Sequence, residues 1–184
     1  MTDNYKKLQK KSQDYINNLY NNKIVIKVQT GTSGQAVGAD EILKSLSLKS
    51  NNNINVLEVG SMGLMYLEPI IVVILPSKDK IFYAHVDEYI ANKIYKHYET
   101  NESIYKENAF AYDSTNTLDI GLPKISDLPQ ISKQLRIATR NFGEITPGDI
   151  FQYVNSGGYQ AINKALFEMT PENVVDEVKN SGLR

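Results

Sequence analysis

The alternation of hydrophobic and polar positions predicts both helices and strands along the chain. Apolar residues spaced by three or four positions predict amphipathic helices over residues 4–20, 39–48 and 87–98. Alternating or continuous apolar runs predict strands over residues 23–30, 54–60, 70–76 and 80–86. The glycine-rich stretch 31–38 lies between the first strand and its helix, and we interpret it as a turn.

The order of these elements predicts an α/β fold. The first two strands are joined by a helix and should therefore run parallel, because such crossovers are right-handed. The third and fourth strands are joined by a short turn and should form an antiparallel hairpin. We therefore expect a four-stranded mixed sheet flanked by helices, which is the thioredoxin-like arrangement.

The remaining sequence divides the chain into four expected segments. An N-terminal helix lies within residues 1–22, and the thioredoxin-like domain covers 23–100. Residues 101–135 are polar and contain two prolines, which indicates a linker. Residues 136–184 should form a short helical segment after an extended stretch at 136–143. Helix starts are predicted there at Thr146-Pro147 and at Thr170-Pro171, each with the threonine as the cap.

Composition excludes several classes of function. The chain has 184 residues, with 20 Lys and Arg against 21 Asp and Glu. This balance argues against a general nucleic-acid binder and against a polybasic membrane anchor. No apolar run is long enough for a spanning helix, and no secretory signal is visible, so we expect a cytoplasmic protein without direct membrane insertion. The absence of cysteine excludes disulfides, cysteine nucleophiles and all-cysteine metal sites.

Several short motifs together resemble one family of proteins. The sequence contains TGTSGQAVGADE, LEVGSMGLMYLEP, RNFG, GGY, ALFEMTPE and KNSGLR. These motifs resemble the NADH-binding flavoprotein subunit (51 kDa type) of complex I and related NAD(P)-linked or electron-bifurcating hydrogenases and formate dehydrogenases. The resemblance covers residues 23–98 and 136–184. It implies a thioredoxin-like ferredoxin domain in the first of these stretches.

In that family the ferredoxin domain holds a [2Fe–2S] cluster with C-x4-C in the first loop and C-x3-C in the second. The matching positions here are Ser33, Gly38, Ser61 and Met65. None of them is a thiolate, and such clusters require thiolates or an occasional histidine. The resemblance therefore implies vestigial cluster positions and no cofactor in this chain. The family's FMN, NADH and remaining iron–sulfur sites are expected only in a C-terminal part that lies beyond this sequence.

Other chemical interpretations of the same loops are weaker. The stretch 31–38 precedes a helix and is a candidate anion-binding loop, but it lacks a Walker motif. Ser33 and Ser61 have no neighbouring base that would make either of them a nucleophile. Met62 and Met65 are candidate soft metal ligands that we interpret as packing residues. Three further residues have structural interpretations: His85, His97 and Glu68.

The sequence thus favours a cluster-free scaffold or docking part of an NADH-oxidising flavoprotein subunit, with no catalytic residues and no metal site of its own. Its expected partners are other subunits of an electron-transfer complex. The alternative is a free-standing thioredoxin-like module that binds a small anion or a protein partner. An independent enzyme is not supported, because no nucleophile–base pair or metal-ligand set is present. A reading frame that continued past Arg184 into a glycine-rich loop would favour the first interpretation.

Overall fold

The computed structural model describes residues 3–100, 103–116, 118 and 120–183. The chain forms two compact units, each described by itself below. The larger unit is Leu19–Gly148, and the smaller combines Met1–Asn18 with Asp149–Arg184.

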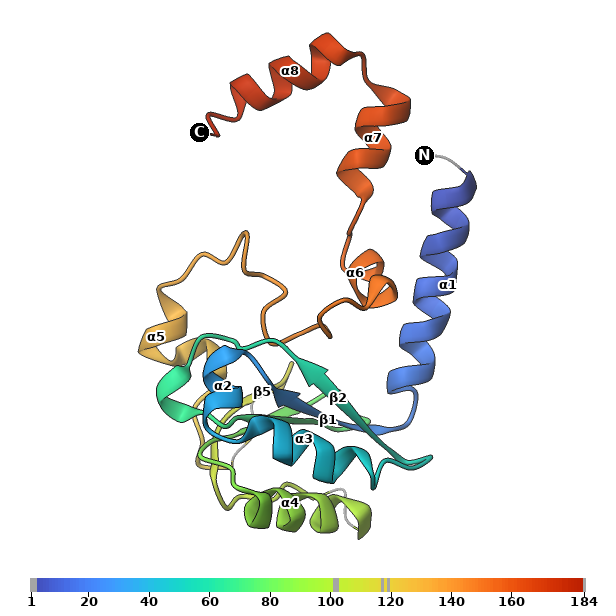
Figure 1. The fold of residues 1–184 in the computed structure, drawn as a ribbon. Helices are drawn as coiled ribbons and strands as arrows, with labels where there is room; N and C mark the ends of the chain where they lie inside the picture. Colours follow the sequence, from blue (N-terminus) through green and yellow to red (C-terminus); the bar gives the residue numbers. More distant parts are fainter. Residues whose placement is uncertain (1–2, 101–102, 117, 119, 184) are drawn as a thin grey trace. The chain divides into compact units, whose positions relative to one another are not determined.

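The larger unit is built on a mixed β-sheet (Figure 1). Its strands are β1 (Ile24–Gln29), β2 (Ile54–Val59), β3 (Ile71–Ile74), β4 (Lys80–Tyr83) and β5 (Ala109–Asp113), in the order β2-β1-β3-β4-β5. β1 pairs with β2 in parallel and with β3 antiparallel, and β3–β4 is an antiparallel hairpin. The predicted α/β class, the parallel first pair and the hairpin are confirmed.

The sheet has five strands, and the expectation of four was wrong. β5 lies in the stretch that the sequence suggested was a linker, and it pairs antiparallel with β4. It is short, with only Ala111 and Tyr112 buried among its five residues. The free edge of β4 supplies the hydrogen-bonding partner, which local hydrophobicity did not reveal.

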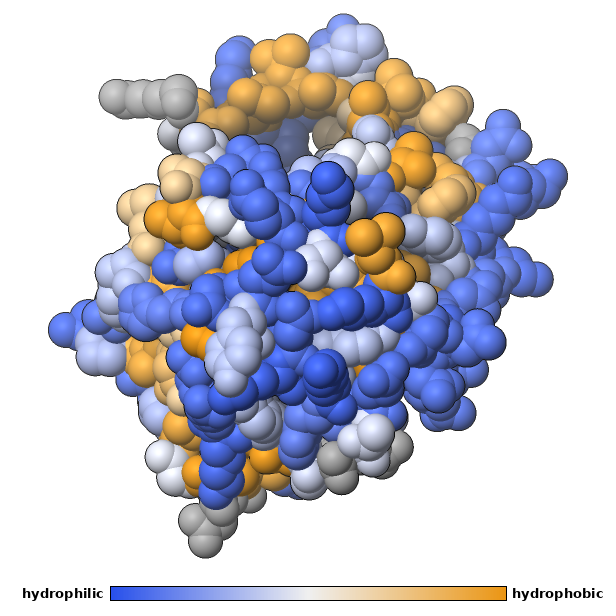
Figure 2. Space-filling view, turned by 60° about the horizontal axis from the view of Figure 1, so that its bottom comes forward, coloured by the Kyte–Doolittle hydropathy of each residue, from blue (hydrophilic) through white to orange (hydrophobic). Residues whose placement is uncertain are grey.

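Helices cover both faces of the sheet. α3 (Ala39–Ser47) and α4 (Glu88–Thr100) pack on one face, where they bury Ile42, Leu46 and Ile94 against Ile26 and other strand residues. The other face is covered by residues in and beside η2 (Ile125–Asp127) and α5 (Pro129–Ser132), which pack against Val25, Val72 and Phe82. Viewed from the side of α4, mostly hydrophilic side chains are exposed (Figure 2).

Two local predictions for the larger unit were wrong. The expected turn 31–38 contains a short helix, α2 (Thr32–Ala36), because the amide of Gln35 donates to the carbonyl of Gly31. The stretch 136–143 is not extended, and its second half forms turns closed by Phe142 N–H to Thr139 O and Glu144 N–H to Asn141 O.

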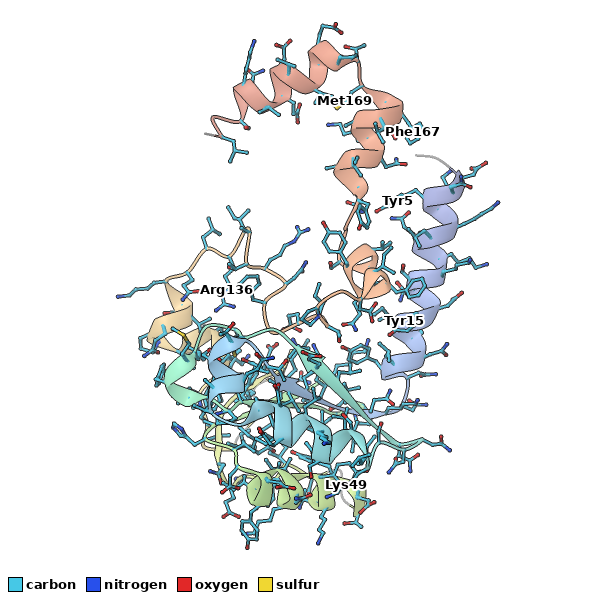
Figure 3. All side chains as sticks on the ribbon, viewed as in Figure 1. Tyr5, Tyr15, Lys49, Arg136, Phe167 and Met169 are labelled. Carbon is cyan, nitrogen blue, oxygen red and sulfur yellow. The ribbon has the colours of Figure 1, made fainter. Side chains whose placement is uncertain are left out.

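The smaller unit joins the N-terminal helix to the C-terminal helices. It contains all but the last two residues of α1 (Asp3–Tyr20), with α6 (Ile150–Asn155), α7 (Gln160–Glu168) and α8 (Pro171–Asn180). Tyr5 and Tyr15 project from α1 (Figure 3), and their hydroxyls donate to Gly158 O at 2.7 Å and Asp149 Oδ2 at 2.8 Å. These bonds tie α1 to Gly158 and to the start of α6.

One of the two predicted helix caps was wrong. Thr170 caps α8 as expected, because its Oγ1 accepts from the amide of Asn173 at 3.2 Å. α6, however, is capped by Asp149, whose Oδ1 accepts from the amides of Phe151 and Gln152. The hydroxyl of Thr146 instead donates to the carbonyl of Glu58 at 2.7 Å. This contact to β2 takes Thr146 out of the capping position.

Candidate functional site

The loops that follow β1 and β2 meet at one edge of the sheet. The two strands are parallel, so their carboxyl ends lie together. The contact is close, because a Cβ added to Gly31 would lie 2.8 Å from the Cβ of Ser61. Only a residue without a side chain lets the backbones approach this far. This edge is the region that the sequence singled out.

The four positions that the resemblance implies to be vestigial have different surroundings. Ser33 is half-buried in α2, and Ser61 is half-buried two residues after the end of β2. Gly38 precedes α3 with φ +95°, a left-handed conformation that disfavours any side chain. Met65 lies in η1 (Met65–Leu67) with 66% of its surface exposed. Within the described part of the chain, Ser61 is the one of these four with a side-chain hydrogen-bond partner.

That partner is Glu68, a buried carboxylate. The hydroxyl of Ser61 donates to Glu68 Oε1 at 2.6 Å and accepts from the amide of Gly63 at 3.1 Å. Nearby, the hydroxyl of Thr30 donates to Glu58 Oε1 at 2.6 Å. Glu68 Oε2 has no hydrogen-bond partner within the part of the chain that the structure describes. Hydroxyl–carboxylate pairs therefore occupy the edge where the resembling family places cysteines.

This edge does not fit the [2Fe–2S] cluster of that family. Ser61 is engaged by Glu68, Gly38 offers no ligand atom, and Met65 exposes its thioether. Cluster iron requires thiolate sulfur, which the chain lacks. The described residues also include no group of three or more His, Cys, Asp or Glu side chains placed to hold a metal ion.

A cavity of about 360 Å³ lies beside Gly38 and Glu68. Its polar lining is mainly acidic, with Glu41, Asp87 and Glu88 in addition to Glu68. One carboxylate oxygen of Asp87 already has a partner, because Oδ1 accepts from the amide of Ile90 at 2.7 Å. An anion at this position would meet carboxylates on several sides. The lining does not favour the interpretation of residues 31–38 as an anion-binding loop.

The two histidines have different surroundings. His85 lines this acidic cavity, is exposed and has φ +52°. His97 lies in the last turn of α4, where its Nε2 is 2.8 Å from the carbonyl oxygen of Ser103. This contact supports a structural role for His97.

Sequence reasoning missed a buried ion pair on the sheet. Lys27, in the middle of β1, is 3% exposed, and its Nζ lies 3.0 Å from Glu144 Oε2 and 2.7 Å from Glu144 O. Glu144 also pairs with Lys80 at 2.9 Å. Burial lowers the pKa of the Lys27 ammonium in spite of its carboxylate partner. The available signal was a lysine inside a mostly apolar strand.

The comparisons with known proteins find a sequence relationship over part of the chain. No family model matches the chain. Over 52 residues the chain is 58% identical to the NADP-reducing hydrogenase subunit HndC of Solidesulfovibrio fructosivorans. The chain is thus a relative of HndC over part of its length. The matched stretch is 28% of this chain and 10% of HndC.

Similarity to solved structures is lower. A thioredoxin-like [2Fe–2S] ferredoxin from Aquifex aeolicus aligns with 50% of this chain and 94% of its own, at 12% identity and a TM-score of 0.44. A cysteine-to-serine variant of that ferredoxin aligns with 47% of this chain and 96% of its own, at 14% identity and a TM-score of 0.40. Among the described residues, no helix is both long and apolar enough to cross a membrane.

Proposed function

We propose that this chain is the cluster-free docking part of an NAD(P)-linked, flavin-containing oxidoreductase subunit. The supporting observation is the edge where the loops after β1 and β2 meet. There, hydroxyl–carboxylate pairs replace ligands, and large apolar side chains reach solvent. The relationship to a hydrogenase subunit, HndC, supports a partner that is another subunit of such a complex.

The docking surface consists of Val37, Met65 and Tyr66. These side chains are 53%, 66% and 58% exposed, and all three lie on the two loops. Exposed apolar side chains on the loops at one edge of a sheet are typical of surfaces that another protein covers. The acidic cavity beside Val37 adds charge to the same edge. We therefore expect the partner to present apolar residues with a cationic side chain beside them.

Assembly with an oxidoreductase subunit tests this proposal. The tagged protein is purified from its native host, and co-purifying subunits are identified by mass spectrometry and assayed for NAD(P)H-dependent dye reduction. Met65→Glu or Val37→Asp should abolish co-purification and the associated activity, because each places a charge in a desolvated interface. A photo-crosslinking residue at position 65 should attach to the same subunit.

Leu48 supplies the matched control for the docking variants. It is 83% exposed and directly follows α3, whereas the docking surface lies near the start of that helix. Leu48→Glu should leave the assembly intact. Assembly that survives both Met65→Glu and Val37→Asp would contradict the proposal. Recovery of the protein without any partner would favour a free-standing module instead.

A second prediction concerns cofactors. The chain purified alone should contain neither iron nor flavin and should be colourless, because it has no thiolate and its loop positions offer no cluster ligands. Metal analysis and a visible absorption spectrum measure this directly. The cluster absorption of a parallel sample of a cysteine-ligated [2Fe–2S] ferredoxin provides the positive control. Stoichiometric iron in the chain would refute the assignment of these loops as cluster-free.

A further inference from the structure

A second cavity lies on the sheet face that η2 and α5 cover. Its volume is about 180 Å³, and its lining comes from β1, β3, β4 and β5, from Met62, and from residues between 125 and 144. Most of the exposed surface of the lining is apolar, with contributions from Val72, Phe82, Ile125 and Ile131. None of the four vestigial positions lines it.

The end of β1 presents an unsatisfied donor to this cavity. The side chain of Gln29 lines the cavity, and the residue has 0% of its surface exposed. Its Oε1 accepts from the amide of Met62 at 3.0 Å, and this bond fixes the orientation of the side-chain amide. Its Nε2 has no hydrogen-bond partner in any residue that the structure describes. A buried donor without an acceptor is costly, which indicates that an acceptor belongs in the cavity.

Arg136 is held next to this donor by the same residue. Its Nη2 donates to the carbonyl of Met62 at 2.7 Å, so Met62 contacts both Gln29 and Arg136 through its backbone. Gly143 leaves the space beside them open. A Cβ at Gly143 would lie 3.0 Å from the Met62 Cβ and 3.7 Å from Gln29 Nε2. The guanidinium and the amide donor therefore converge near Met62.

The charge of the lining favours an anion. Glu144 already pairs with Lys27 and Lys80, and Asp113 pairs with Lys80 at 3.5 Å. The carboxylates are thus engaged by the two lysines, and the arginine side chains add further positive charge. The charged side chains of the lining are Lys27, Lys80, Arg136, Arg140, Glu144 and Asp113.

The size and polarity of the cavity restrict the anion. Sites for drug-sized ligands and cofactors measure about 300–1,000 Å³, so this cavity is too small for a nucleotide. The apolar walls disfavour a bare inorganic dianion, because charge without compensating contacts is expensive to bury. A compact molecule with one carboxylate and a short apolar tail matches both the donors and the walls.

We propose that this cavity binds a short-chain organic carboxylate, with its head group on Gln29 Nε2 and Arg136 and its tail along Phe82 and Ile131. The head group supplies the acceptor that Gln29 lacks. The assignment does not depend on the docking function proposed above, because its residues are different. A titration of the whole chain can therefore succeed or fail independently of assembly.

The test follows the side-chain amide signal of Gln29 by nitrogen–proton NMR on the full chain. Butyrate should shift this signal saturably, whereas butyramide, which has the same shape without the charge, should not. A shift with inorganic phosphate but not with butyrate would overturn the assignment to carboxylates. Equal effects of butyrate and butyramide would show that charge does not decide binding and would overturn the assignment to carboxylates. No effect of either would show a cavity filled by water only.

Two variants locate the head group. Arg136→Met should weaken butyrate binding by about tenfold or more, since it removes a charged hydrogen-bond donor, and Arg136→Lys should recover part of the affinity. Lys93→Met removes a cation from α4, outside the cavity lining, and should leave binding unchanged. Gln29→Leu identifies the amide signal by its loss, and binding is then followed through the backbone amide of Gly143. Unchanged affinity in Arg136→Met would overturn the placement of the carboxylate.

Discussion

Replacing Glu144 with alanine is expected to lower the free energy of unfolding of the larger unit by about 3 kcal/mol, because it leaves the buried Lys27 without its counter-ion. This value is at the low end for a broken buried pair, since 46% of the Glu144 side chain is exposed to solvent. Urea unfolding followed by circular dichroism measures the change. Asp113→Ala removes the more exposed partner of Lys80 and should cost about 1 kcal/mol or less.

Lys27→Met should restore what Glu144→Ala removes. Methionine has a similar volume and no charge, so the double variant should regain most of the lost stability. Such recovery would identify the uncompensated ammonium as the cause. If Glu144→Ala costs no more than Asp113→Ala, the pair does not contribute as the geometry indicates.

The same ion pair predicts a dependence on pH. Burial raises the pKa of the Glu144 carboxyl, but the charges and hydrogen bonds of Lys27 and Lys80 outweigh burial and hold that pKa below its ordinary value. A carboxyl with a depressed pKa stabilises the fold above its unfolded value of about 4.3. This stability is lost as the pH falls through the folded pKa. Glu144→Ala should therefore flatten the acid limb of the stability curve.

Gly34→Ala is expected to destabilise the same unit by about 2 kcal/mol. A Cβ at this buried position would lie 2.6 Å from the carbonyl oxygen of Gln29 and 3.5 Å from the Cβ of Ala39. Because the clash is with backbone, relief requires movement of β1 or α2, which we estimate at about 3 kcal/mol. The higher helix propensity of alanine offsets about 1 kcal/mol of that cost.

Gly60 provides the matched control for Gly34. It lies in the second loop of the same edge, and a Cβ there would have no atom within 4 Å. Gly60→Ala should change the free energy of unfolding by about 0.5 kcal/mol or less. Thermal unfolding of the two variants side by side measures the difference. Equal stability of both would show that α2 can move away from β1 at little cost.

The sheet was predictable where the hydrophobic pattern was strong. Ile24, Ile26 and Val28 alternate along β1, and all three enter one core. β5 was missed because only two of its five residues are buried. Its pairing also depends on β4, which is distant in sequence. Both Thr146 and Asp149 are good capping residues, so local rules could not choose between them. In the structure, the hydroxyl of Thr146 binds the carbonyl of Glu58, and Asp149 is the cap.

The candidate sites show the same limit. The meeting of the two loops followed from parallel strands, which a helix between strands predicts. The partnership of Lys27 and Glu144 did not follow, because 117 positions separate the two residues and any exposed carboxylate was an equal candidate. The convergence of Gln29 and Arg136 on Met62 likewise depends on backbone groups that carry no sequence signal.

The smaller unit has a consequence for folding during synthesis. The bonds from Tyr5 and Tyr15 reach across 153 and 134 positions of the chain. At translation rates of about 5–20 residues per second, the partners of α1 are made roughly 7–30 s after α1 itself. Its apolar stripe is uncovered throughout that interval. The nascent chain is therefore expected to recruit a chaperone to α1 before the ribosome reaches α6.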